Sequence, residues 1–205
     1  MRMEIKMKTS KKTRNLLLAM LLGDGTLNSK GYFSMRHGLA QEDYINWKRD
    51  LLKNDFRVTD CYYVSNNGYG SYEMRTMTYK CLKHYRKIIY KSGKKDIANR
   101  KLLDRLTPIG LAIWYMDDGG LSQKKRDGVI VANELMLNTH LSKEGNQVII
   151  DYFRDMWDIK FTQVMNRGLY RLRCGTKEAR KFIEIVKPYV SQVPSMAHKL
   201  KLKSI

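Results

Sequence analysis

Hydrophobic positions along the chain form two series of elements that follow one another in the same order. Residues 17–25 (LLAMLLGDG) and 111–119 (LAIWYMDDG) each have the apolar spacing of a helix that ends in Asp-Gly, and 94 positions separate them. Thr107 is expected to cap the second helix, and Pro108 suits its first turn. The pattern therefore predicts one motif helix in two copies.

The elements after each Asp-Gly also match. Each half predicts a hairpin, an amphipathic helix, a second hairpin and a last helix, which Thr78 opens in the first half and Thr176 in the second. The segments are residues 26–36, 44–52, 61–76 and 78–89, and then 121–139, 149–156, 161–174 and 176–186. Both halves read αββαββα, which predicts an α+β fold of two pseudo-symmetric repeats, residues 1–105 and 106–205, with motif helices near 10–25 and 108–119.

The composition of the chain indicates which class of partner it binds. The 205 residues include 39 Lys and Arg against 20 Asp and Glu, a formal charge of +19, and the excess is present in both halves. A hydrophobic content of 43% excludes a disordered basic tail, because such tails cannot bury enough apolar surface to fold. A folded body that is basic throughout is typical of a protein that binds nucleic acid.

Cysteine spacing and hydropathy indicate the compartment. Cys61, Cys81 and Cys174 contain no C-x-x-C pair, so neither a zinc site nor a disulfide framework is predicted. The apolar run 16–22 is too short to span a membrane, and no cleavage site follows it. We expect an intracellular protein in a reducing compartment, neither secreted nor bound to a membrane.

Two carboxylates are the main candidates for chemistry. Asp24 and Asp118 each lie at the C-terminal end of a motif helix, where partial negative charge disfavours a carboxylate by up to about 1 kcal/mol. A bound cation would offset that cost, and carboxylate and carbonyl oxygens suit Mg²⁺. One Asp-Gly alone would indicate only a helix stop, and Asp117 is the alternative to Asp118.

The two segments resemble the paired motifs of the LAGLIDADG homing endonucleases, in the type that carries both motifs on one chain. Residues 17–25 match loosely, and the second motif departs further at Trp114, Tyr115 and Met116, but both keep the terminal Asp-Gly. The resemblance covers about residues 13–200, because the order αββαββα is also that of the family.

The resemblance implies a fold and a site. The two motif helices would pack side by side under a saddle of antiparallel sheet, and Asp24 and Asp118 would hold shared Mg²⁺ ions, for which Mn²⁺ can substitute. The backbone carbonyls of Gly23 and Asp117 would complete the coordination. Lys95 and Lys199 resemble in position the basic residues that the family places beside the cleavage site, although each could equally be an ordinary solvated lysine. His140 and His198 are weaker candidates.

Strand alternation indicates how DNA would be contacted. Arg171 and Arg173 share one face of their strand, as Glu73 and Arg75 do on theirs. A two-stranded ribbon fits the major groove, where Arg reads guanine and Asn reads adenine. The residues expected to contact bases are Arg36, Arg75, Asn138, His140, Arg171 and Arg173, and those expected to contact phosphates are Lys11, Lys12, Lys124, Lys125 and Arg126.

Together these features predict an intron-encoded, DNA-binding hydrolase. We expect a monomer that cuts both strands of a long, roughly pseudo-palindromic duplex across the minor groove and leaves 3′ overhangs, as the resemblance implies. The alternatives are an RNA maturase that assists splicing of its host intron, a non-cleaving regulator of the same fold and, more remotely, a basic ribosome-associated protein. The presence of both Asp24 and Asp118 favours the nuclease.

Overall fold

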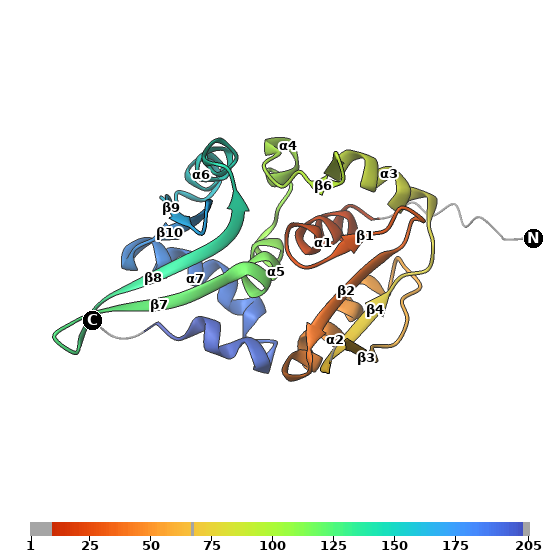
Figure 1. The fold of residues 1–205 in the computed structure, drawn as a ribbon, viewed down its shortest axis with the longest axis horizontal. Helices are drawn as coiled ribbons and strands as arrows, with labels where there is room; N and C mark the ends of the chain where they lie inside the picture. The colour runs from red at the N-terminus through yellow and green to blue at the C-terminus, as the bar shows by residue number, and fades with distance from the viewer. Residues whose placement is uncertain (1–9, 67, 203–205) are drawn as a thin grey trace, which may run out of the picture. The chain divides into compact units, whose positions relative to one another are not determined.

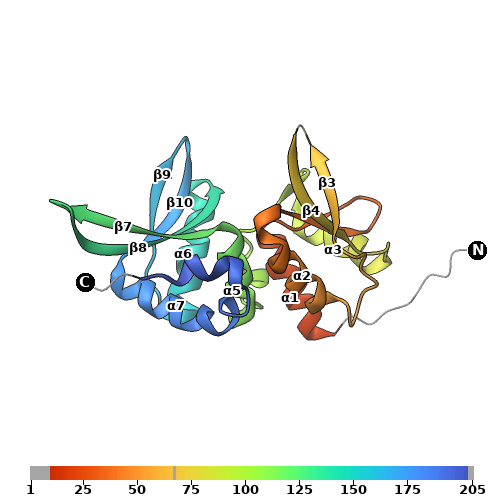
Figure 2. The same ribbon diagram turned by 90° about the horizontal axis from the view of Figure 1, so that it is seen from below.

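The computed structural model describes residues 10–66 and 68–202. Contacts divide the chain into two compact units: residues 1–97 with 193–195, and residues 98–192 with 196–205. Each unit holds one antiparallel four-stranded sheet and one motif helix (Figures 1 and 2). The predicted α+β class and the two repeats are confirmed.

The first unit begins with the first motif helix. Its elements are α1 (Lys11–Leu22), β1 (Thr26–Leu27), β2 (Phe33–Gly38), the 3-10 turn η1 (Leu39–Gln41), α2 (Glu42–Leu52), β3 (Tyr62–Asn66), β4 (Tyr69–Arg75), α3 (Lys80–Ile89), β5 (Tyr90–Lys91) and β6 (Lys94–Lys95). The sheet order is β1-β2-β4-β3, and β5 pairs with β6 in a separate small hairpin.

The second unit repeats this order. Its elements are α4 (Arg100–Leu103), α5 (Pro108–Asp118), β7 (Gly119–Arg126), β8 (Val129–Leu141), α6 (Lys143–Trp157), β9 (Thr162–Asn166), β10 (Leu169–Cys174), α7 (Thr176–Val190) and the 3-10 segment η2 (Pro194–Leu200). The sheet order β7-β8-β10-β9 matches that of the first unit strand by strand. The unit starts ahead of Leu106 because α4 packs on α6.

Helix boundaries follow local chemistry. The Ser10 hydroxyl accepts a hydrogen bond from the Thr13 amide and so caps α1, and Pro108 occupies the first turn of α5. Both motif helices are apolar around most of their circumference, which is typical of helices buried on several sides. Thr107 does stand at the N-cap of α5, but among the described residues its side chain makes no capping bond, so that expectation was wrong.

Each sheet buries one face against helices. In β2 the side chains of Phe33, Met35 and His37 are buried, whereas Arg36 between them is exposed. Helix α2 packs on β2 and β4, and α6 and α7 cover β8 and β10 in the second unit (Figure 2). The period-two alternation therefore separates a core face from an open face, as predicted.

The hairpin turns match the sequence. Asp127 and Gly128 both have positive φ (50° and 80°), as do Arg167 and Gly168 (51° and 83°), which gives the turn twist that a two-residue hairpin needs. In the first unit Gly31 and Gly68 also have positive φ (91° and 83°), Gly31 within a longer loop over residues 28–32. Asn67 of the predicted Asn-Asn-Gly turn lies outside the described residues.

Some boundaries differ from prediction. Helix α3 begins at Lys80 instead of Thr78, because the Tyr79 amide bonds the Gly31 carbonyl and so holds the preceding segment against the first hairpin. Helix α7 does begin at Thr176, as predicted, and the Thr176 hydroxyl bonds both backbone groups of Asn133, which ties α7 to β8. The short elements α4, β5, β6 and η2 were not predicted.

Two sequence expectations concern compartment. Cys61, Cys81 and Cys174 are all free of disulfide bonds. Within residues 10–66 and 68–202, no helix has both the length and the apolar character that crossing a bilayer requires.

The position after each motif Asp must be glycine, because neighbouring atoms leave no room for a Cβ. A Cβ at Gly119 would lie 2.0 Å from Cδ2 and 2.6 Å from the backbone oxygen of Tyr115, and one at Gly25 would lie 2.7 Å from the Met20 oxygen. We therefore expect Gly119→Ala to lower the free energy of unfolding by about 1–3 kcal/mol, the usual cost of overpacking. Denaturant unfolding checks this.

Gly120 is the matched control, because a Cβ there meets no atom within 4 Å. Gly120→Ala should leave stability unchanged or raise it by at most about 1 kcal/mol. Equal losses from both substitutions would contradict the steric explanation.

Candidate metal-binding carboxylates and nucleic-acid interface

A lysine closes the C-terminal end of each motif helix. Lys95 of β6 donates to the carbonyl oxygens of Gly23 (2.5 Å) and Gly25 (3.0 Å) at the end of α1. Lys199 of η2 donates to the carbonyls of Met116 (2.5 Å), Gly119 (2.9 Å) and Tyr115 (3.3 Å) at the end of α5. The two repeats therefore use the same device with lysines from the corresponding last segment.

These contacts have an electrostatic cause. The last carbonyls of a helix lack intrahelical donors and carry partial negative charge, so an ammonium group is favourable there. The Tyr115 hydroxyl also donates to the Lys199 carbonyl (2.7 Å), which fixes the segment that carries the lysine. Lys95 and Lys199 are thus held beside the Asp-bearing turns, and a role for them in catalysis stays a prediction.

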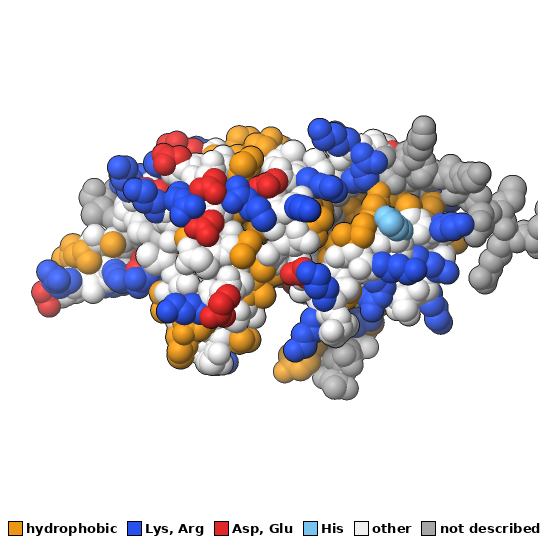
Figure 3. Space-filling model, turned by 90° about the horizontal axis from the view of Figure 1, so that it is seen from above, with side chains coloured by type: hydrophobic (Ala, Val, Ile, Leu, Met, Phe, Trp, Pro, Cys, Tyr) orange, Lys and Arg blue, Asp and Glu red, His pale blue; other side chains and the backbone are white. Residues whose placement is uncertain are grey.

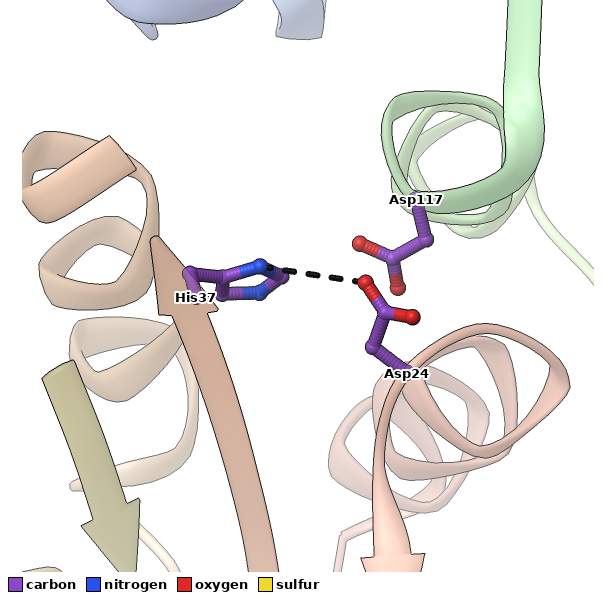
Figure 4. Close-up of side chains that lie close together, drawn as sticks. All are labelled: Asp24, His37 and Asp117. Carbon is purple, nitrogen blue, oxygen red and sulfur yellow. Dashed lines mark ion pairs between the residues drawn. The ribbon is translucent and has the colours of Figure 1, made fainter. Parts of the chain in front are cut away.

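Asp24 follows α1 and has a buried polar support. Its side chain is 47% exposed, and its Oδ2 lies 3.8 Å from Nδ1 of His37 on β2 (Figure 4). The other ring nitrogen of His37, Nε2, lies 3.1 Å from Nζ of Lys48 on α2, a fully buried side chain that stacks over the Tyr44 ring at 4.1 Å. In the tautomer whose Nε2 accepts from Lys48, the imidazole hydrogen is on Nδ1 and faces Asp24.

Asp117 and Asp118 are the last two residues of α5, and both are partly exposed. Figure 4 shows Asp117 extending from this end of the helix. The following strand β7 starts directly at Gly119, so both carboxylates lie in the turn that Lys199 closes. Metal binding by the Asp118 side chain stays a prediction.

An open groove in the first unit joins Asp24 to the sheet. It has a volume of about 530 Å³, and its lining includes Asp24, Thr26, Arg36, His37, Glu73 and Arg75. Arg36 and Arg75, both predicted to contact bases, therefore border the same groove as the candidate metal ligand.

Glu73 organises the open face of this sheet. Although it is only 2% exposed, it accepts hydrogen bonds from Nε of Arg36, Nε of Arg75 and the hydroxyl of Tyr62 (2.9 Å). Burial acts to raise the pKa of Glu73, but the hydrogen bonds from Arg75, Arg36 and Tyr62 outweigh it and lower the pKa. The carboxylate therefore stays charged beneath the two guanidinium groups.

The second sheet has a looser counterpart. Glu134 of β8 pairs with Nζ of Lys124 on β7 (3.1 Å) and with Nη1 of Arg173 on β10 (3.4 Å). Arg171 has a buried Nε that finds no hydrogen-bond partner among the residues described. The other predicted contact residues, Lys125, Asn138 and His140, lie on β7 and β8.

Sequence reasoning missed His37, Lys48 and Glu73. His37 continues the buried alternation of Phe33 and Met35, and Lys48 lies one turn after the buried Tyr44, so each occupies a position that is otherwise apolar. Such a misplaced polar residue was the available signal. Glu73 and Arg75 were placed on the correct face, but Arg36 becomes the second partner of Glu73 through the strand register.

The basic charge is distributed unevenly. In the view of Figure 3 the charged side chains of the first unit are mostly Lys and Arg, whereas on the second unit Asp and Glu side chains are interspersed among them. Residues 1–100 contain 21 Lys and Arg against 9 Asp and Glu, and residues 101–205 contain 18 against 11.

Comparisons with known proteins find a family model that covers most of the chain. The model of the LAGLIDADG DNA endonuclease family matches residues 14–182. Protein RecA of Mycolicibacterium chitae is 31% identical over 199 residues, which cover 90% of this chain and 45% of the relative. A probable intron-encoded DNA endonuclease 3 of Mycosarcoma maydis is 27% identical over 138 residues, 65% of this chain and 95% of the relative. This chain thus spans about half the length of the RecA relative.

Solved structures share the fold. The homing endonuclease I-WcaI bound to its DNA recognition sequence superposes with a TM-score of 0.78 at 21% identity, over 95% of this chain and 88% of that chain. The N-terminal LAGLIDADG domain of DUF199/WhiA has a TM-score of 0.52 at 13% identity, over 89% of this chain and 84% of that domain. At these identities the likeness supports the fold alone.

The lysine caps can be tested without substrate. Lys199→Met removes the ammonium group that satisfies three carbonyls, and we expect the free energy of unfolding to fall by about 1.5–3 kcal/mol. Lys95→Met should act in the same direction. Chemical denaturation without DNA or metal is the measurement.

Exposed neighbours serve as controls, since Lys94→Met and Lys201→Met remove the same charge from solvated positions. Stability that is unchanged in Lys95→Met and Lys199→Met would show that these lysines do not hold the helix ends.

Glu73 should make stability depend on pH. Because its pKa is lowered in the folded protein, its contribution is complete above the ordinary glutamate pKa and is lost as pH falls through the lowered value. The stability advantage of wild type over Glu73→Gln should therefore be largest near neutral pH and shrink in acid. Unfolding curves across this pH range measure it, and a constant difference would contradict the charged state of Glu73.

Proposed function

The chain belongs to the LAGLIDADG DNA endonuclease family, and on that premise we propose that it is a site-specific homing endonuclease. It binds a long, roughly pseudo-palindromic duplex as a monomer and hydrolyses one phosphodiester bond in each strand across the minor groove, leaving 3′ overhangs. The observation that carries this proposal is the repeated helix end, where a carboxylate and a lysine-closed turn occur together in both repeats.

Mg²⁺ is the proposed cofactor, and Mn²⁺ should substitute for it. Asp24 and Asp118 supply hard carboxylate oxygens, and the carbonyls of Gly23 and Asp117 would be further ligands. The donor chemistry fits, because Asp24 is half-exposed and the Gly23 carbonyl keeps a second lone pair beside its bond to Lys95. When bound, the ion would polarise the scissile phosphate and activate water.

The protein's own residues would prepare this site. Lys95 and Lys199 place positive charge next to the two Asp-bearing turns, where charge develops on a phosphate during hydrolysis. His37 supports Asp24 from the buried side, which limits the directions in which that carboxylate can point. His140 and His198 stay weaker candidates for contact with a phosphate.

Duplex binding would use the open faces of the two sheets. The side chains proposed to contact bases are Arg36, Arg75, Asn138, His140, Arg171 and Arg173, and those proposed to contact phosphates include Lys124 and Lys125. A formal charge of +19 supplies the attraction for a polyanion. Both repeats keep their carboxylate, so no observation favours the maturase or the non-cleaving regulator over the nuclease.

Cleavage of a randomised duplex library tests this proposal. In Mg²⁺ the wild-type protein should yield one family of cut ends, and Asp24→Asn and Asp118→Asn should each abolish double-strand cleavage, because an amide holds Mg²⁺ poorly. Binding should persist in both variants and also in wild type with Ca²⁺. Sequencing of the cut ends and a gel-shift assay provide the two readouts.

Asp117→Asn is the matched control, since it removes a neighbouring carboxylate that is assigned only a backbone contact. It should retain cleavage. Wild-type cutting by Asp24→Asn, or robust cutting in EDTA, would overturn the proposed metal site, and loss of activity in Asp117→Asn alone would exchange the roles of the two aspartates.

A further inference from the structure

Glu73 lies on the open face of the first sheet, which we propose to face DNA, although a carboxylate there would repel phosphates. In the strand register it is opposite Arg36 of β2 on one side and Tyr62 of β3 on the other, and Arg75 is two residues along its own strand. The side chains of Arg36, Tyr62 and Arg75 meet around the Glu73 carboxylate. The carboxylate is therefore covered and not presented to a partner.

Both arginines bind Glu73 through Nε and not through their Nη groups. Arg36 donates Nε–H to Oε2 of Glu73, and Arg75 donates Nε–H to Oε1. Recognition of guanine O6 and N7 requires two N–H donors in a fork, and the two Nη groups of a guanidinium form such a fork. Among the described residues, the hydrogen bonds to Arg36 and Arg75 go to Nε alone, so the Nη ends stay available.

Both guanidinium groups also remain accessible. The side chains of Arg36 and Arg75 are 47% and 44% exposed, although the carboxylate between them is buried. The Arg75 guanidinium lies 5.6 Å from the centre of the Tyr32 ring, which limits its movement on another side. The cluster keeps a net charge of +1, so it still attracts a polyanion.

Strand geometry sets the spacing. Arg36 is opposite Glu73 in the register. Arg75 is therefore the diagonal neighbour of Arg36, and the Cα atoms of the two arginines are about 7–8 Å apart. Successive bases of one DNA strand rise by about 3.4 Å, so this distance corresponds to about two base steps. A shared carboxylate prevents the two side chains from moving independently.

We infer that Glu73 is a specificity-determining positioning residue, which holds Arg36 and Arg75 as one rigid reader of two guanines within about two base pairs of each other in one half of the target. This inference rests on the proposed function, since it assigns a specificity to the sheet of a DNA-cutting enzyme. Glu73 touches no base, because the arginines and Tyr62 cover it.

The second sheet provides a matched contrast. Glu134 holds a lysine, which is a point charge without a fork, and it contacts Arg173 through Nη1. That contact occupies part of the fork that Arg36 and Arg75 leave available. Glu134→Gln therefore removes a carboxylate of similar setting without releasing a paired reader.

Selection from a randomised duplex library in Ca²⁺ tests the inference, with wild type, Glu73→Gln and Glu134→Gln compared by sequencing of bound DNA. Gln has only one acceptor oxygen, so it cannot accept hydrogen bonds from both arginines as the carboxylate does. Glu73→Gln should therefore lower the preference for guanine at two nearby positions by about tenfold. Preferences elsewhere should persist, and Glu134→Gln should leave those two positions unchanged. Thermal unfolding shows that each variant is folded.

If Glu73→Gln does not fold, the exposed arginines still decide the question. Arg36→Ala and Arg75→Ala should each weaken preference at both guanine positions, and the double variant should lose less than the product of the two single effects, because the residues act as a unit. Independent readers would instead lose one position each, with multiplicative effects, and that result would overturn the inference.

The outcomes separate two failures. A folded Glu73→Gln that keeps every wild-type preference overturns the role of Glu73 and leaves the proposed function intact. A wild-type protein that selects no sequence and cuts no duplex overturns the proposed function, and the inference with it.

Discussion

Closure of each motif helix by a distant lysine is the interaction on which the rest of each repeat depends. The helix ends in carbonyl groups of partial negative charge, and a carboxylate occupies or follows the same turn. Lys95 and Lys199, which lie in the last segment of their repeats, offset the negative charge of both the carbonyls and the carboxylate. Because these segments come 70 to 84 residues after the carbonyls that they satisfy, the capped helix end requires the whole repeat to fold back on itself.

The same turn fixes where the sheet begins. Gly25 and Gly119 have no room for a side chain, so the first strand can leave the helix directly after the carboxylate. In the first unit, neighbouring residues of β2 then serve opposite needs: His37 faces inward and supports Asp24, and Arg36 faces outward and pairs with Glu73. Candidate chemistry and candidate recognition are thus one residue apart, and both border one groove.

Acidic residues on the open faces explain how a protein of charge +19 orders its basic side chains. Long basic side chains are otherwise mobile, and ordering them at the moment of binding costs conformational entropy. Glu73 and Glu134 hold pairs of basic side chains in the unbound protein. Charge–charge contacts within each sheet therefore prepare a surface whose overall sign remains positive.

The sequence by itself determined the repeated αββαββα order, the motif helices, the glycine turns and the faces of the strands, because periodicity, turn residues and caps act over a few neighbouring positions. It also indicated Asp24 and Lys95 as candidates, through position in the repeat. Only the tertiary structure decided what Lys95 touches, why His37 and Lys48 are buried, and which arginines share Glu73. Apart from the Arg75–Glu73 pair, which lies on one strand, those contacts join residues that are 11 to 72 positions apart. Such pairings are fixed by strand register and packing, which no local pattern encodes.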